Sequence, residues 1–113
     1  MNTNNNKIAV IGMACRFPGA SNLEEYWQNL VSGKEGLKFF TDEELAEFDP
    51  DYENLRKNPD YVKVRGILND IDKFDAPFFG MTPKEAAGTD PQHRVWLETA
   101  WHALENAGCD PLS

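Results

Sequence analysis

Two cysteines, Cys15 and Cys109, are the first candidates for nucleophilic chemistry in this sequence. A catalytic cysteine needs a position that favours the thiolate and a base within reach. Cys15 lies at a predicted strand-to-loop junction, where backbone donors and Arg16 could lower the pKa of its thiol. Nothing beside it resembles a catalytic turn, and cysteine is commonly a small buried hydrophobe. We therefore interpret Cys15 as structural, and Cys109, just past a predicted helix end, has an even less favourable setting.

The two histidines do not have the spacing of metal ligands. His93 and His102 are nine residues apart, whereas two ligands on one face of a helix are four apart. We interpret His93 as a packing histidine on the apolar side of a predicted helix. His102 falls on the polar side near Glu98 and Glu105 and is interpreted as a solvated histidine. The sequence therefore predicts no zinc or iron site.

The charged residues at the start of the same predicted helix are candidates for acid–base work. Asp90 and Arg94 flank this start, and we interpret them as an N-cap and an ion pair rather than as catalytic groups. Together with Gln92, they are expected to position the helix and its neighbours. We predict no catalytic, cofactor-binding or metal-binding residue in this chain.

Residues 7–12 form a short apolar run that is closed by Gly12. This composition is typical of a strand buried on both faces, and we predict the first strand of an α/β unit. Dinucleotide-binding folds also begin this way, but their phosphate turn needs further glycines at fixed spacing. The residues after Gly12 lack them, so that fingerprint fails.

Helical spacing of apolar residues predicts two amphipathic helices. The first spans about residues 22–32, with a capping box formed by Ser21 and Glu24. The second spans residues 91–107, with Asp90 as its cap and Pro91 in its first turn. Its apolar arc of roughly 160° is wider than a single stripe, so we expect two neighbours to cover it.

Shorter elements are predicted between these helices. A cap at Thr82 begins a helix that runs to about residue 87, and residues 61–68 alternate as an edge strand would. The aromatic residues 74–80 are expected to pin a loop onto the core. Residues 41–60 repeat a capping pattern and hold most of the net negative charge, and we interpret them as a solvated surface excursion.

The composition is that of a globular chain of 113 residues with a formal net charge of −8. Its size predicts one core. The negative charge argues against partners such as nucleic acid or an anionic membrane surface. No apolar run approaches the roughly 20 residues that cross a bilayer, and residues 1–6 lack the features of a signal peptide. We expect a cytoplasmic chain with both cysteines reduced.

Several stretches taken together resemble the start of the β-ketoacyl synthase (ketosynthase) domain of modular polyketide synthases. Their order and spacing match over residues 7–111. The stretches are residues 8–20 (IAVIGMACRFPGA), residues 23–27 (LEEYW) with Leu30, residues 74–86 (FDAPFFGMTPKEA), residues 90–94 (DPQHR), Leu97 with Glu98, and residues 103–108 (ALENAG).

The resemblance implies an α/β fold, specifically the N-terminal portion of a thiolase-like fold, with the first buried strand and amphipathic helices but incomplete. Residues 1–6 would be a disordered Asn-rich tail, and residues 7–113 an N-terminal fragment of a ketosynthase domain. The complete family domain is a homodimer. It extends an acyl chain by decarboxylative Claisen condensation on thioesters carried by the phosphopantetheine of an acyl carrier protein.

The family's reaction uses one cysteine and two histidines, and none of the motifs that hold them occurs here. Cys15 belongs to a Cys-Arg-Phe-Pro signature that is not the nucleophile. We therefore expect an inactive opening part of a condensing enzyme, truncated from a longer protein, with no bound cofactor. The alternatives are a non-catalytic interaction piece that complements a separately encoded remainder of a megasynthase domain, and a self-sufficient α/β binding domain related only by descent.

Overall fold

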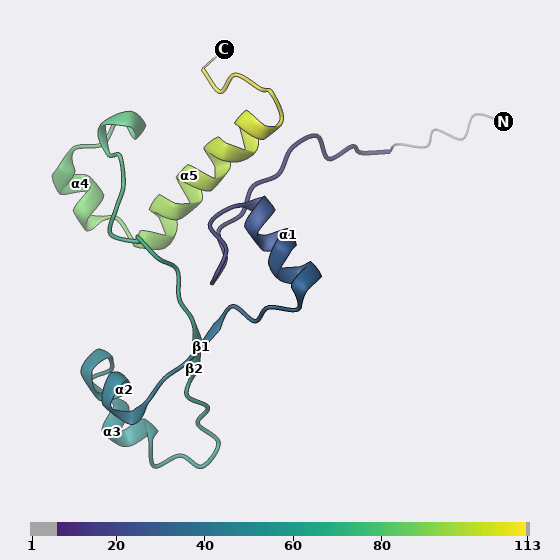
Figure 1. Ribbon diagram of the computed structural model, residues 1–113. Coiled ribbons are helices and arrows are strands. Elements are labelled where there is room, and N and C mark those ends of the chain that lie inside the picture. Colours follow the sequence, from purple (N-terminus) through teal and green to yellow (C-terminus); the bar gives the residue numbers. More distant parts are fainter. Residues whose placement is uncertain (1–6, 113) are drawn as a thin grey trace. The chain divides into compact units, whose positions relative to one another are not determined.

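The computed structural model describes residues 7–112, so the expected disordered tail at residues 1–6 lies outside the described residues. The chain divides into two compact units: one joins the residues up to Arg16 with those from Asp70 onward, and the other spans Phe17–Asn69 (Figure 1). The prediction of one core is therefore wrong. Most large apolar side chains remain exposed, and the buried core residues are Ala20, Leu45 and Tyr52 in one unit and Ala76 and Ala86 in the other.

The helix α5 (Pro91–Asn106) organises the unit that contains both ends of the chain. The Asp90 side chain accepts a hydrogen bond from the Gln92 N–H at 2.8 Å, and Pro91 occupies the first turn, as predicted. At its other end, Gly108 has φ +70°, and the Cys109 N–H donates to the Leu104 carbonyl at 2.9 Å. This arrangement ends the helix at Asn106, one residue before the predicted end.

Two short elements precede α5 in the same unit. The 3-10 helix η1 (Pro77–Phe79) interrupts the aromatic loop, and α4 (Pro83–Gly88) follows it. Thr82 and Glu85 form the predicted capping box at the start of α4. The helix ends one residue later than predicted, with Gly88 as its last residue.

The predicted buried strand over residues 7–12 does not form. These residues have no regular secondary structure, and Ile8 is 94% and Val10 75% exposed. A strand needs neighbours that take up its backbone hydrogen bonds, and within residues 7–112 the two strands belong to the other unit. An apolar composition alone could not supply those neighbours.

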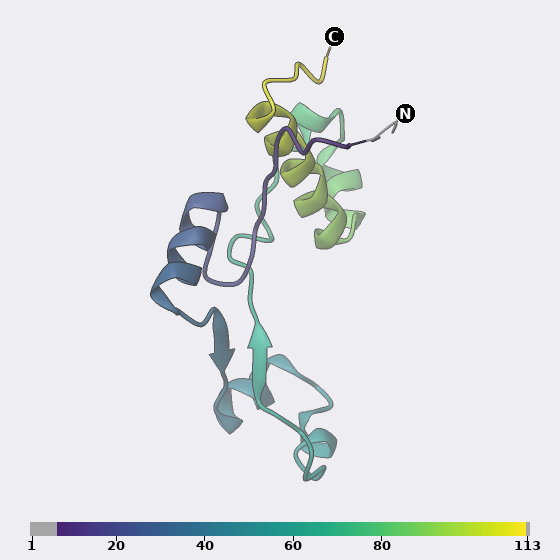
Figure 2. The same cartoon turned by 90° about the vertical axis from the view of Figure 1, so that its right-hand side faces the viewer.

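The N-terminal segment instead runs beside α5 in the opposite direction (Figure 2). The Met13 N–H donates to Asn106 Oδ1 at 3.1 Å, and Arg16 lies further along, beside Glu98. A Cβ on Gly12 would lie 2.6 Å from Ala107 Cβ and 2.7 Å from the Ala103 carbonyl oxygen. Gly12 is therefore required for close approach of the backbone to the helix.

The second unit begins with the helix α1 (Leu23–Ser32). Its N-cap is Asn22 and not Ser21: Asn22 Oδ1 accepts from the Glu25 N–H at 2.9 Å, and Glu25 Oε2 accepts from the Ser21 N–H at 2.7 Å. The cap is therefore one residue later than predicted: the Asn22 backbone is extended, and its side chain reaches the third amide of the helix. Gly33 has φ +66° and ends the helix as predicted.

The rest of this unit is a small hairpin with two short helices. The strands β1 (Leu37–Phe39) and β2 (Val64–Gly66) pair antiparallel, with Lys38 opposite Arg65. Between them lie α2 (Asp42–Phe48) and α3 (Tyr52–Leu55), which contact each other. The predicted edge strand is thus confirmed only at its centre, and the sequence analysis missed β1.

Candidate functional site

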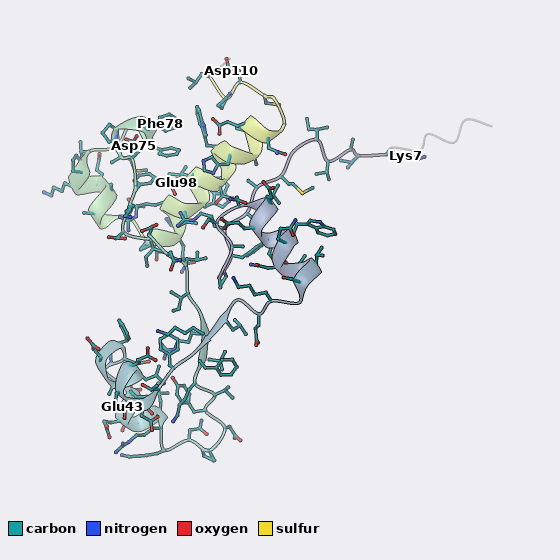
Figure 3. All side chains as sticks on the ribbon, viewed as in Figure 1. Lys7, Glu43, Asp75, Phe78, Glu98 and Asp110 are labelled. Carbon is teal, nitrogen blue, oxygen red and sulfur yellow. The ribbon has the colours of Figure 1, made fainter. Side chains whose placement is uncertain are left out.

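Cys15 lies in an environment that suits a structural thiol. The side chain is half-buried, and burial raises the pKa of the thiol above its ordinary value. Arg16 could have stabilised a thiolate, but its Nη1 donates to Glu98 Oε2 on α5 at 3.0 Å. Glu98 is labelled on α5 in Figure 3. The local chemistry therefore favours the neutral thiol, the opposite of what a nucleophile requires.

Both histidines of α5 face solvent. His102 is exposed, as predicted for the polar side of the helix. His93 is exposed as well, so its interpretation as a packing residue is wrong. Trp96, one turn further on, is 67% exposed, which shows that this side of α5 is not covered within residues 7–112. Among the residues described, no group of three His, Cys, Asp or Glu side chains could hold a metal ion.

Arg94 connects three segments rather than pairing with Asp90. Its guanidinium donates to the Ala86 carbonyl of α4 at 3.0 Å and to the Ile71 carbonyl at 3.3 Å. The predicted ion pair is therefore wrong, because the backbone carbonyls of neighbouring segments lie within reach of this long side chain. A carbonyl acceptor has no sequence signal, which is why these partners could not be predicted.

The aromatic loop at residues 74–80, predicted to be pinned onto the core, packs onto α5. Phe78 contacts Trp101 edge-to-face with ring centroids 4.6 Å apart, and Phe74 stacks on Phe79 at 5.0 Å (Figure 3). Gly80 has φ +68° and ends η1. The loop thereby covers part of the wide apolar arc of α5.

The acidic segment, residues 41–60, is only partly a solvated surface segment. Lys38 Nζ binds Glu44 at 2.8 Å, and Lys63 forms an ion pair with Asp42. Arg65 Nη2 binds Asp49 at 2.7 Å. We call this set of three ion pairs the hairpin–α2 network.

In the hairpin–α2 network, hydrogen bonds from the basic partners lower the pKa values of the three acids below their ordinary values. These pairings were not predicted from the sequence. A signal was present, because Lys63 and Arg65 alternate along a strand and therefore share one face.

The contacts within each unit fix the chain's own segments against one another. Arg16, Arg94 and the aromatic loop hold neighbours to α5, while the hairpin–α2 network holds α2 to the hairpin. No helix among residues 7–112 has the length and apolar character that spanning a bilayer demands.

Comparison with solved structures gives the fold to which these segments belong. The chain is similar to ketosynthase twelve from the bacillaene polyketide synthase of Bacillus amyloliquefaciens, with a TM-score of 0.71 and 44% identity over 86% of the chain and 17% of that structure. It is also similar to an oxazolomycin ketosynthase domain of Streptomyces albus, with a TM-score of 0.74 and 37% identity over 91% of the chain and 18% of that structure. The expected fold class, the N-terminal portion of a thiolase-like fold, is confirmed.

Sequence comparison agrees. The chain is 48% identical over 106 residues to a phenolphthiocerol/phthiocerol polyketide synthase of Mycobacterium tuberculosis, a match that covers 94% of the chain and 7% of that protein. It is 43% identical to the polyketide synthase PksN of Bacillus subtilis, over 89% of the chain and 2% of that protein. The chain thus spans less than a tenth of the length of these relatives.

A profile described as "Beta-ketoacyl synthase, N-terminal domain" matches residues 5–113. The match includes the Cys-Arg-Phe-Pro signature, the aromatic loop and α5, which are the segments whose contacts are described above. The chain belongs to the β-ketoacyl synthase family.

Proposed function

We propose that this chain is the opening part of a ketosynthase that extends an acyl chain by decarboxylative Claisen condensation on carrier-protein thioesters. The observation that carries the proposal is the family match over residues 5–113, joined to structural likeness with ketosynthases of polyketide synthases. The partners of the complete enzyme would be an acyl carrier protein and the remainder of the synthase. The complete domain would be a cytoplasmic homodimer that needs neither nucleic acid nor a membrane.

The proposed reaction has two bond-forming steps. A cysteine thiolate attacks the acyl thioester, and the phosphopantetheine thiol of the carrier leaves. A malonyl-type thioester then loses CO2, and its enolate carbon attacks the acyl-cysteine carbonyl, which frees the cysteine. Two histidines assist decarboxylation and stabilise the oxyanion.

We propose that all three of these catalytic side chains lie outside this chain. Burial raises the pKa of the Cys15 thiol, and Arg16 is bound to Glu98. His93 and His102 are exposed and lie far from Cys15 in the sequence. The chain's own contribution is structural: Arg94 fixes α4 and the turn at Ile71 to α5, and Gly12 admits the N-terminal segment to the same helix.

The test is intact-mass spectrometry after incubation with an acyl-pantetheine thioester. We expect no acylation of the 113-residue chain, and acylation of a longer protein that contains it, at a cysteine other than Cys15. The Cys15→Ala variant of the longer protein should still be acylated, which serves as the control. Stoichiometric acylation of the isolated chain that disappears in Cys15→Ala would overturn the proposal.

The main alternative is a non-catalytic piece that complements a separately encoded remainder. The reading frame after Ser113 distinguishes the two: a frame that continues through a nucleophile motif supports the condensing enzyme, and a stop codon supports the complementing piece. Co-expression then decides the second case, because a complementing piece must co-purify with its remainder and restore acylation.

The carrier protein should not dock on α2. Carriers of this family are generally acidic, and Glu43 and Glu47 of α2 are exposed, so like charges would repel. Glu43→Gln with Glu47→Gln in the complete domain should leave carrier affinity unchanged or raise it slightly. Glu44 is left intact because it binds Lys38 and completes the cap at Thr41. A clear loss of affinity at low salt, measured by calorimetry, would refute this expectation.

A further inference from the structure

We draw no further inference here: the strongest candidate, the exposed apolar stripe of Trp27, Leu30 and Val31 on α1, carries nothing because nothing in the described part of the chain shows what covers it.

Discussion

The hairpin segment, residues 37–66, and the N-terminal segment, residues 7–12, differ in where their partners lie. In the hairpin segment, Leu45 is fully buried and Tyr52 is 2% exposed. Two acids of α2 and its C-cap Asp49 form ion pairs with basic residues of β1, of β2 and of the position before β2. In the N-terminal segment, Ile8 and Val10 are almost wholly exposed and no strand forms. The hairpin segment contains the apolar and charged partners of its own side chains, and the N-terminal segment does not.

This difference shows that an apolar residue type does not by itself say whether the side chain is buried within the chain. Leu45 is an apolar residue whose neighbours in the same unit bury it. The apolar run at residues 7–12 has the composition of a strand buried on both faces, and such a strand lies inside a sheet with helices over it. Within residues 7–112 the one sheet is the β1–β2 hairpin, so the run does not find in the described residues the neighbours that its composition predicts.

The largest expected effect tests the closed core of the hairpin segment. Leu45→Ala should destabilise this unit by about 3 kcal/mol, because truncation of a fully buried leucine removes its contacts and leaves a cavity. The matched control Val10→Ala, at a 75% exposed position, should change the free energy of unfolding by less than about 0.5 kcal/mol. Urea denaturation of the 113-residue chain measures both. Equal losses would show that the two segments do not differ as described.

The next effect sharpens the comparison by supplying the missing partners. In a longer protein that includes the remainder of the domain, Val10→Ala should cost about 2 kcal/mol, because a buried valine then loses its packing. The amide protons of residues 8–11 should also exchange far more slowly with solvent than in the isolated chain. If hydrogen exchange at these amides is equally fast in both proteins, the apolar run is not a strand of the complete fold.

A smaller effect concerns the contact that the N-terminal residues up to Arg16 make with α5. The Arg16 and Glu98 side chains are 17% and 25% exposed, and their ion pair is 3.0 Å long. A double-mutant cycle with Arg16→Met and Glu98→Gln should give a coupling energy of about 1 kcal/mol, more than most exposed pairs. Lys73 and Asp70, an exposed pair in the same unit, give the control cycle with a smaller coupling. A coupling indistinguishable from the control would mean that Arg16 does not fix this segment to α5.

Local signals predicted most of the helices, because their determinants lie within a few residues. The capping boxes at Thr41 and Thr82 and the cap at Asp90 are each formed by side chains two or three residues from their amides. The cap of α1 is Asn22 and not the predicted Ser21. Both residue types are good N-caps, so the local pattern alone does not choose between them. Local rules thus predict a helix better than they predict its first residue.

Partners distant in sequence were predicted poorly. The acceptors of Arg94 are backbone carbonyls on two other segments, and the short strand β1 pairs with residues about 25 positions or more away. Neither feature has a local pattern. For the candidate site, the absence of a catalytic setting at Cys15 and the histidines stays a prediction. The sequence did not indicate that Arg16 is bound to Glu98.

The smallest expected effect comes from the hairpin–α2 network. Its Lys38–Glu44 and Lys63–Asp42 ion pairs are exposed and therefore screened by salt, while Arg65–Asp49 is partly buried. The pKa values of Asp42, Glu44 and Asp49 are lowered in the folded chain. Their stabilisation is therefore present above the unfolded values of about 3.9 for Asp and 4.3 for Glu, and it is lost as the pH falls through the lower folded values. The pKa of Lys63 is raised, so its contribution is lost only as the pH rises above about 10.4. Stability of the hairpin segment should be nearly constant from about pH 5 to pH 9 and should fall in acid.

A pair of variants isolates the loss of stability at low pH, which we call the acid limb. Asp42→Asn removes a carboxylate that binds Lys63 and accepts from the Tyr52 hydroxyl, so the urea midpoint should fall less between pH 6 and pH 3 than in the unmodified chain. Glu43→Gln removes the neighbouring charge, which forms no ion pair among residues 7–112, and should leave the acid limb unchanged. Raised salt should weaken the difference between the two variants, because exposed charges are screened within about 10 Å at 0.1 M. Identical acid limbs in both variants at low salt would show that the acids of α2 are simply solvated, as their run in the sequence first indicated.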